Sequence, residues 1–445
     1  MTALPLEAAS GAAALGLAWR EPVEALAAAR DEPMALLMLG GADGGCGGRS
    51  YLCAFPDFTI IEDDPAAGFA KLRAAMPAKA ASPSGPGFSG GYAGLFGYDL
   101  GQAFERTPRS PEGLAAWPAI SVGWYPAVAV FDHATQTLTV EGEPAAARRL
   151  ADAIEAGSTT VEAAPGRFEQ VWDDARYLAA ARRAIDYVRA GDVFQVNLSH
   201  PFRGALPGRD GPFRLIKRLA QQSPAAFSAY LRIDDQRAVV TNSPERFVAV
   251  DASGRVETRP IKGTRARCAD LQEDRRAREA LAASDKDRAE NLMIVDLMRN
   301  DLARVCAPGT VRTPDLFKVE SFANVHHLVS TVTGQLAEGR NVFDLISAAF
   351  PPGSITGAPK VRAMEIIDEL EGESRGPYCG ALGWIGADGA ADLNVMIRTA
   401  ACLKQGEDWS AEIRSGGAIV IDSDPAEELA ETRAKAGALI KAAGP

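Results

Sequence analysis

Residues 245–265 read ERFVAVDASGRVETRPIKGTR, with two strand-like stretches on either side of the segment DASG. Asp251 in its first position and Gly254 in its fourth favour a β-turn, so the stretch predicts a β-hairpin and an antiparallel sheet. If Asp251 faces Gly254, Glu245 lies opposite Pro260, and Lys262 follows two residues later on the same face. Pro260 cannot donate a ladder hydrogen bond, so we expect pairing to end there and Lys262 to enter a loop.

The rest of the chain contains further consecutive strands and several amphipathic helices. Strands are expected at 193–198, on both sides of Asp234 within 226–241, and at 380–385, 392–403 and 409–420. Helices are expected at 173–190, 284–305 and 425–443. Because strands that follow one another through short turns pair antiparallel and helices cover them, the fold class is α+β.

The chain has 445 residues, enough for two ordinary domains or one large one. An Ala-rich, helix-like stretch from residue 141 ends in Pro165-Gly166, and we place a boundary there, between residues 1–165 and 166–445. Residues 76–91 are rich in Pro, Ser, Gly and Ala and are typical of a mobile loop.

Composition excludes several classes of protein. Hydrophobic residues make up 47% of the chain, and the formal net charge is −11, which argues against a general nucleic-acid or anionic-membrane binder. The six cysteines form no CxxC motif, so neither a zinc site nor a disulfide framework is indicated, and a reducing cytoplasm is expected. No apolar run approaches the roughly 20 residues that span a bilayer, and the N-terminus does not resemble a secretion signal.

Lys262 and Glu245 are the first candidate site residues. The predicted register makes them diagonal neighbours, about 7–8 Å apart at the backbone and within reach of long side chains. A carboxyl and an amine that converge in this way form either a general acid and a nucleophile or a cross-strand salt bridge. The sequence of the hairpin leaves both interpretations open.

Two pairs of carboxylates occur at helical spacing. Asp287 and Glu290 are three residues apart on one predicted helix, and Glu428 and Glu431 are three apart on another. Two such pairs facing one cavity would suit Mg²⁺. Acidic residues near helix starts are also favoured by the helix dipole and are usually solvated, so the pattern allows either role.

Two glycine-containing segments, 354–360 and 414–418, permit close backbone approach to an anionic ligand, although they match neither a dinucleotide-binding motif nor a P-loop. The neighbours His326 and His327 could ligate a metal. Without a matching Cys/His cluster, we favour a substrate hydrogen bond or a structural role for them.

These residues belong to an ordered series of motifs that resembles the chorismate-utilising enzymes. The motifs are SPERF at 243–247, PIKGTR at 260–265, DRAENLMIVDLMRND at 287–301, VHHLVS at 325–330, TGAPK at 356–360, IRT at 397–399 and GYAGLFGYDL at 91–100. The resemblance implies antiparallel β-sheets packed as a sandwich with helices outside. It also implies a β-rich N-terminal subdomain, 1–165, and a chorismate-binding catalytic domain, 166–445.

The resemblance also implies the composition of the site. Glu290, Glu428 and Glu431 would hold Mg²⁺ against the ring carboxylate of chorismate, with Asp287 nearby and acting through water. The implied substrate-holding residues are Tyr378, Arg398, Lys435, Gly416 and Gly417, and His327 and Thr356 match further positions that contact substrate.

Two positions separate branches of the family. Members that add water carry a lysine where this chain has Gln195, so the resemblance implies ammonia as the incoming nucleophile. Anthranilate-forming members carry alanine where this chain has Lys262. The lysine therefore implies amination at C4, through attack of Lys262 on C2 with Glu245 as general acid.

A glutaminase of the expected type would need a Gly-x-Cys-x-Gly nucleophile elbow with a downstream His-x-Glu; the chain contains no His-x-Glu, and Cys379 in the segment PYCGA does not fit an elbow. We therefore expect ammonia from a separate glutaminase partner. The shared ammonia-using motifs keep one alternative, an anthranilate-forming enzyme. Mild departures from the family pattern at Ala266 and Ala418 keep another, a non-catalytic protein that binds chorismate or an amino acid.

Overall fold

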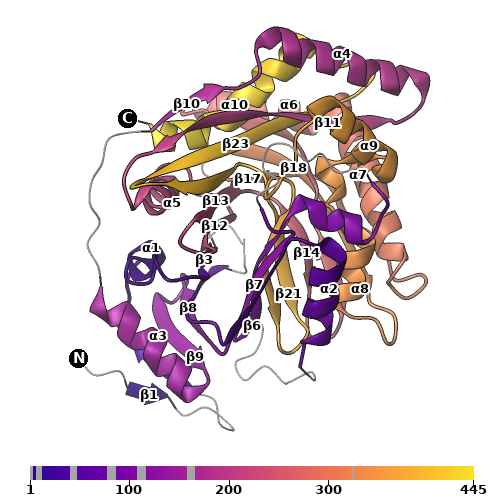
Figure 1. Ribbon diagram of the computed structural model, residues 1–445. Helices are drawn as coiled ribbons and strands as arrows, with labels where there is room; N and C mark the ends of the chain where they lie inside the picture. Colours follow the sequence, from indigo (N-terminus) through magenta and orange to yellow (C-terminus); the bar gives the residue numbers. More distant parts are fainter. Residues whose placement is uncertain are drawn as a thin grey trace.

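The computed structural model describes residues 4–6, 13–40, 48–77, 87–107, 117–157, 166–322 and 325–444. Within these ranges, two large antiparallel sheets face each other, and helices cover their outer sides (Figure 1). Every strand pair that carries a register is antiparallel, as the sequence predicts. The α+β sandwich is therefore confirmed.

The first sheet has 13 described strands. Its order is β1(Leu4–Leu6), β2(Ala13–Leu17), β9(Thr137–Gly142), β8(Ala127–Asp132), β4(Arg49–Cys53), β3(Ala35–Leu39), β12(Phe227–Arg232), β13(Arg237–Ser243), β22(Thr399–Gln405), β23(Asp408–Ile419), β11(Gln195–Leu206) and β10(Arg167–Gln170), with β19(Gly357–Ala358) paired to β11.

The second sheet has ten described strands. Its order is β16(Ile261–Ala266), β18(Val325–Gln335), β15(Arg255–Thr258), β14(Arg246–Val250), β21(Ala391–Val395), β20(Ala381–Gly386), β6(Gly91–Phe96), β7(Ile120–Tyr125) and β5(Phe58–Glu62), with β17(Arg312–Ser321) paired to β18.

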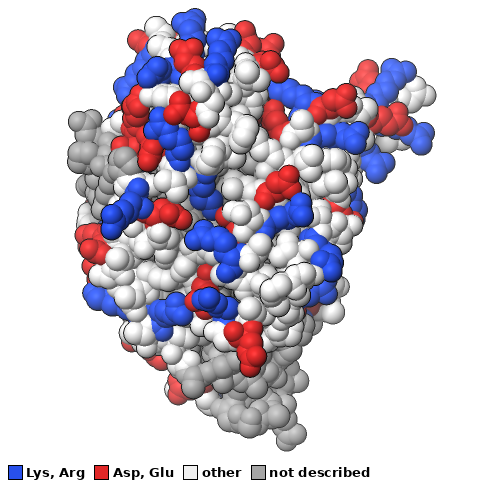
Figure 2. Space-filling view, turned by 90° about the vertical axis from the view of Figure 1, so that its right-hand side faces the viewer, with Lys and Arg blue, Asp and Glu red and all other residues white. Residues whose placement is uncertain are grey.

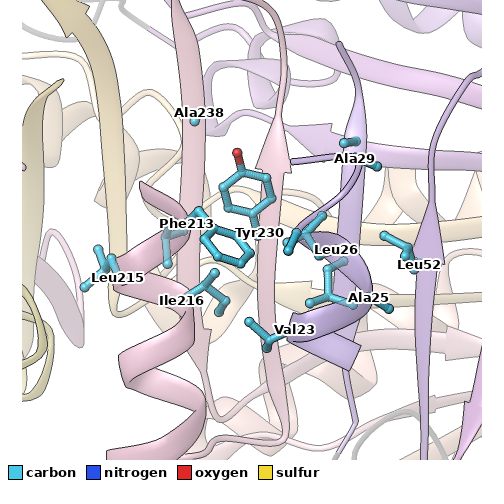
Figure 3. Packing of buried hydrophobic residues seen from close by; sticks show 14 of the residues in the cluster. Val23, Ala25, Leu26, Ala29, Leu52, Phe213, Leu215, Ile216, Tyr230 and Ala238 are labelled. Carbon is cyan, nitrogen blue, oxygen red and sulfur yellow. The ribbon is translucent and has the colours of Figure 1, made fainter. Parts of the chain in front are cut away.

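Buried side chains stabilise the sandwich in three layers, one between the sheets and one on the outer side of each sheet. Between the sheets, Leu36 and Leu231 of the first sheet share a cluster with Leu95 and Trp384 of the second. Outside the first sheet lie α1(Pro22–Leu26), α3(Pro144–Ala156), α5(Gly211–Gln222) and α10(Pro425–Ala443), and Figure 3 shows Tyr230 surrounded by residues of α5 and α1. Burial of this apolar surface holds the two sheets against each other and the helices against the sheets.

The remaining helices cover the second sheet and the end of β11. Outside the second sheet lie α2(Pro65–Ala74), α7(Asp285–Ala303) and α8(Val342–Ala349), while α4(Asp174–Ala190) and α9(Lys360–Glu371) pack near β11. α6(Leu271–Ala282) contacts β16 and β17. The predicted helices match α4, α7 and α10, since Asp173 and Ser284 cap α4 and α7 and Gly191 ends α4 in a left-handed conformation.

The hairpin formed by β14 and β15 has a different register from the one expected. Ala249 pairs with Glu257, and the amide of Asp251 donates to Arg255 O, so each residue faces a partner one position later than predicted. The turn is a three-residue loop with Gly254 at φ +83°, where a left-handed residue is required. The expected loop at Lys262 is also wrong: Lys262 lies in strand β16, inside a register shift between Ile261 and Thr264.

The single strand expected at 392–403 is two strands in different sheets. β21 pairs with β14 and β20 in the second sheet, and β22 pairs with β13 and β23 in the first. The chain crosses between the sheets at residues 396–398, and Arg398 has φ +51° there. Continuous alternation in sequence could not reveal that crossing.

The boundary near residue 165 falls in 158–165, outside the described residues, as does most of the predicted loop at 76–91. Both sheets contain strands from either side of residue 165, so the division into 1–165 and 166–445 stays a prediction. None of the described helices combines the length and apolar character that crossing a bilayer would require. On the face drawn in Figure 2, basic and acidic residues alternate rather than forming one extended basic surface.

Candidate active site

Lys262 lies at the bulge in β16, and its Nζ donates a 3.4 Å hydrogen bond to Ser354 O. Gly263 makes the bulge possible: it has φ +79°, and a methyl group on it would lie 2.9 Å from the Asp287 carboxylate. Burial lowers the pKa of Lys262 and Lys435 adds to this, while Glu290 and Glu245 oppose it. The net direction favours the neutral amine, which is the form that can act as a nucleophile.

Glu245 is 5% exposed and lies beside Lys262, as the sequence predicts in spite of the shifted register. Burial raises its pKa from the ordinary 4.5 to about 7, against the opposing effects of Ser354 and Lys262. The Ser354 hydroxyl is close enough to affect this pKa, but it makes no well-formed hydrogen bond among the described residues. A carboxyl that titrates near pH 7 can serve as a general acid.

The raised pKa of Glu245 predicts a pH-dependent stability effect. Between about pH 4.5 and 7 the folded state keeps a proton that the unfolded chain has lost, so this group's contribution to stability falls as pH rises through 7. Glu245→Gln stays neutral at every pH. It should therefore remove the loss of folding stability, on the order of 1–3 kcal/mol, that ionisation of Glu245 causes in the wild type above pH 7. We expect the melting temperature of Glu245→Gln relative to wild type to be higher at pH 8 than at pH 5. A difference that does not change with pH would contradict the shift.

His327 is buried next to this pair. One ring nitrogen, Nδ1, lies 2.9 Å from Thr264 Oγ1, and burial together with the nearby charge of Arg398 lowers the pKa of His327 to about 4. The imidazole is therefore neutral at pH 7 and can exchange hydrogen bonds with a ligand. His326 has the structural role, because its ring is held by Ser321 at 2.8 Å and Asp274 at 3.1 Å.

Thr356 and Arg398 differ in whether their polar groups have partners within the chain. The Thr356 hydroxyl is fully buried and donates to Pro352 O at 3.2 Å, so its free lone pairs rather than its hydrogen face any ligand. Burial lowers the pKa of Arg398 while Glu245 opposes that shift, and the Arg398 guanidinium has no ion-pair or hydrogen-bond partner recorded among the described residues. A partly buried cation without a partner is suited to an anionic ligand.

The carboxylates of α7 and α10 influence one another across the site. Burial raises the pKa of Glu290 and of Glu428, and Glu431 adds to both shifts. Burial acts in the same direction on Glu431, yet Lys435, 2.7 Å away, holds the pKa of Glu431 below its ordinary value. Three oxygen-donor side chains that repel one another fit a hard divalent cation.

In the described part of the chain, no three carboxylate, His or Cys side chains are gathered closely enough to hold an ion as they stand. Asp287 is held in a 2.9 Å ion pair with Arg265. Its role as a ligand through water therefore stays a prediction, and Glu290, Glu428 and Glu431 are the better candidates.

The substrate-holding residues expected on the first sheet lie around these carboxylates. Gly416 O accepts a 3.1 Å hydrogen bond from Lys435 Nζ, and a methyl group added at Gly417 would lie 2.8 Å from Glu428 Oε2. Gln195 is fully buried, and neither polar atom of its side chain has a partner among the described residues. Since buried amides are normally paired, Gln195 has hydrogen-bonding capacity left for a ligand.

A buried ion network that the sequence analysis missed supports the site from behind. Arg375 forms two hydrogen bonds with Glu371, at 2.7 and 3.1 Å, and donates to Ile355 O and Asn197 O. Arg414 also binds Glu371, at 3.1 Å. The network joins the last residue of α9, β11 and the segment before Thr356. Because Arg375 lies beyond the end of α9, no helical spacing in the sequence signalled its pairing with Glu371.

Tyr378 is buried, and the Arg375 guanidinium lies 5.7 Å from its ring centre. A cavity of about 20 Å³ lies on the other side of Arg375, lined among others by Tyr98, Gln102 and Ser374. It has room for roughly one water molecule and contains none of the candidate catalytic residues. The cluster around Lys262 therefore stays the candidate site.

Comparison with known proteins identifies the family of the chain. Residues 45–441 match the family model described as chorismate binding enzyme. Aminodeoxychorismate synthase component 1 of Salmonella typhimurium is 41% identical over 390 residues, which cover 86% of this chain and 83% of that protein. Anthranilate synthase component 1 of Thermus thermophilus is 40% identical over 371 residues, or 81% and 79% of the two chains.

A solved structure agrees with the fold. The crystal structure of anthranilate synthase component I from Streptococcus pneumoniae TIGR4 superposes with a TM-score of 0.78 at 28% identity, and the match covers 88% of this chain and 92% of that one. The Escherichia coli aminodeoxychorismate synthase component 1 is 42% identical over 356 residues, or 80% of this chain and 77% of that protein. With a family model that spans most of its length, this chain belongs to the chorismate binding enzyme family.

Proposed function

We propose that this protein is an enzyme that aminates chorismate at C4, giving 4-amino-4-deoxychorismate for 4-aminobenzoate biosynthesis. The relatives named aminodeoxychorismate synthase component 1 support this activity. The observation that carries the proposal is Lys262, whose amine is driven toward the neutral form beside a carboxyl of pKa about 7. Anthranilate synthases are almost as similar in sequence, so the residue at position 262 decides between the two products.

The two side chains divide the first step between them. The neutral Lys262 amine attacks ring C2 and forms a C–N bond, the ring double bond shifts, and the C4–O bond breaks. Glu245 gives its proton to the departing hydroxyl, which leaves as water. In the second step ammonia attacks C4, the double bond returns, and the C2–N bond to Lys262 breaks. Lys262 leaves as the neutral amine, and the new ammonium on C4 gives one proton to the Glu245 carboxylate, which restores the starting state of both side chains.

The remaining residues bind the substrate's anionic groups. The Arg398 guanidinium, which has no partner among the described residues, is available for one carboxylate, and Lys435 with the Gly416 and Gly417 backbone is available for the other. Neutral His327 is placed to hydrogen-bond the substrate. The unpaired amide of Gln195 suits ammonia, which can both donate and accept hydrogen bonds.

Glu290, Glu428 and Glu431 are proposed to hold Mg²⁺, which when bound would polarise the ring carboxylate. We expect Glu428→Gln to raise the Mg²⁺ concentration for half-maximal binding by at least about 10-fold, because it removes one charged oxygen donor. Calorimetric titration with MgCl₂ measures this directly. Glu427→Gln, which changes the exposed neighbour on the same helix, is the matched control. Equal Mg²⁺ affinity of both variants and wild type would contradict the assignment.

A separate glutaminase is proposed as the source of ammonia. The name component 1, carried by several relatives, supports a second subunit for those proteins. This chain itself has no His-x-Glu segment, which glutamine hydrolysis by a cysteine nucleophile of this type needs. Ammonium salts at high pH should replace the partner in vitro.

The proposal is tested with chorismate, Mg²⁺ and ammonium, followed by addition of an aminodeoxychorismate lyase. Formation of 4-aminobenzoate is expected, and its absence would count against the proposal. Fluorescent anthranilate released without the lyase would favour the second candidate, which the 40% identity to an anthranilate synthase supports. Binding of chorismate without turnover, even with a glutaminase present, would favour a non-catalytic role.

A further inference from the structure

The polypeptide crosses from the second sheet to the first at residues 396–398, where the candidate substrate-binding residue Arg398 is located. β21 ends at Val395 and β22 begins at Thr399, so the crossing is three residues long. The backbone of Arg398 lies in the left-handed region at φ +51°, which residues other than glycine rarely adopt. Such a conformation persists only where surrounding contacts fix it.

Two buried threonine hydroxyls provide those contacts. Thr241 on β13 and Thr399 on β22 are direct partners in the sheet. Thr399 Oγ1 lies 2.9 Å from Thr241 Oγ1 and 3.1 Å from Ile397 O, and Thr241 Oγ1 donates to Ile397 O at 3.3 Å. Both residues are at most 2% exposed. The hydroxyl pair therefore fixes the carbonyl of the residue that immediately precedes Arg398.

The backbone of Arg398 is held on its other side by Asn242. The Asn242 amide donates to Arg398 O at 2.9 Å, and its side chain is anchored by Ser228 at 2.7 Å and by Ser223 O at 2.9 Å. The start of the crossing is tied to the backbone of Glu245, because Val395 N donates to the main-chain carbonyl Glu245 O at 3.0 Å. The crossing thus links the backbones that present Glu245 and Arg398.

We propose that Thr241 and Thr399 are positioning residues for substrate binding: their hydroxyls clasp Ile397 O and thereby aim the Arg398 guanidinium at a carboxylate of the substrate. The inference rests on the proposed function for the identity of the substrate. Neither threonine side chain needs to touch chorismate. The clasp acts through the backbone at the crossing, where a small rotation at residue 397 would move a side chain as long as arginine by a large distance.

Thr399→Val tests the clasp because valine keeps the shape of threonine and removes the hydroxyl. We expect the dissociation constant and KM for chorismate to rise about 5- to 10-fold, the effect of one well-placed hydrogen bond, while kcat changes less than about 2-fold. Thr399→Ser restores the hydroxyl and should return both constants to within about 2-fold of wild type. Thr333→Val, on β18 in the second sheet, is the control for the loss of a threonine hydroxyl elsewhere.

A double variant separates positioning from general stability. In the Arg398→Ala background, Thr399→Val should raise the chorismate dissociation constant no further, since there is no guanidinium left to aim. An additional increase of the same size, unchanged chorismate binding in the single variant, or failure of Thr399→Ser to recover binding would each overturn the proposal. Calorimetric titration with chorismate gives these constants without turnover. A wild-type protein that binds chorismate but forms no 4-amino product would therefore count against the proposed function alone, and the same titrations would still decide the clasp.

Discussion

Lys262→Ala is expected to reduce formation of the 4-amino product by at least about 10³-fold, in the range seen when a covalent nucleophile is removed. The reason is local: Lys262 Nζ is held by Ser354 O beside Glu245, and burial favours its neutral form. Alanine leaves ammonia without a leaving group to displace at C2. The measurement is the rate of 4-aminobenzoate production with excess lyase, chorismate, Mg²⁺ and ammonium.

The control is Lys318→Ala, which removes an exposed lysine from the neighbouring part of the same sheet. It should leave the rate within about 2-fold of wild type, as is usual for surface substitutions. Release of some anthranilate by Lys262→Ala would agree with the proposal, because the anthranilate-forming relatives are expected to carry alanine there. Retention of more than a tenth of the wild-type rate would exclude a nucleophilic role for Lys262.

Glu245→Gln is expected to lower kcat by roughly 10²- to 10⁴-fold, the usual contribution of a positioned general acid. The amide has nearly the same shape but cannot give a proton to the departing hydroxyl. Because the pKa of Glu245 is about 7, the wild-type kcat should fall at higher pH as the carboxyl ionises. The residual activity of Glu245→Gln should lose this alkaline limb.

Glu338→Gln, at an exposed position outside the site, is the matched control and should keep the alkaline limb. An alkaline limb that survives in Glu245→Gln would assign that limb to another group and would remove Glu245 from the acid role.

The sequence predicted those parts of the site that depend on local pattern. Helices α7 and α10 follow from caps and periodicity, so the spacing of Glu428 and Glu431 on one face was readable in advance. Glu245 and Lys262 were expected to meet, and they do, although the hairpin register was off by one. In a regular hairpin a shift of one residue would place the two side chains on opposite faces. Here the strand is interrupted at residues 259–260 and bulged between Ile261 and Thr264, and that irregularity turns Lys262 toward Glu245.

The parts that could not be predicted depend on contacts between distant segments. Whether residues 392–403 form one strand or two depends on which sheet each half joins, and alternation is the same in both cases. Contacts between distant segments also determine the left-handed conformation of Arg398, whose neighbours come from β13. The same holds for the network of Glu371, Arg375 and Arg414, which involves β11 and the segment before Thr356.

The central claim is that Lys262 forms a covalent bond to the substrate on the way to a 4-amino product. Its most direct test is peptide mass spectrometry of the protein quenched during turnover with chorismate and Mg²⁺, before and after addition of ammonium. The account predicts a mass increase of chorismate less one water on the peptide that contains Lys262, which disappears as ammonium yields the 4-amino product. Steady formation of that product while the Lys262 peptide stays unmodified, or an adduct on a different residue that is consumed instead, would contradict it.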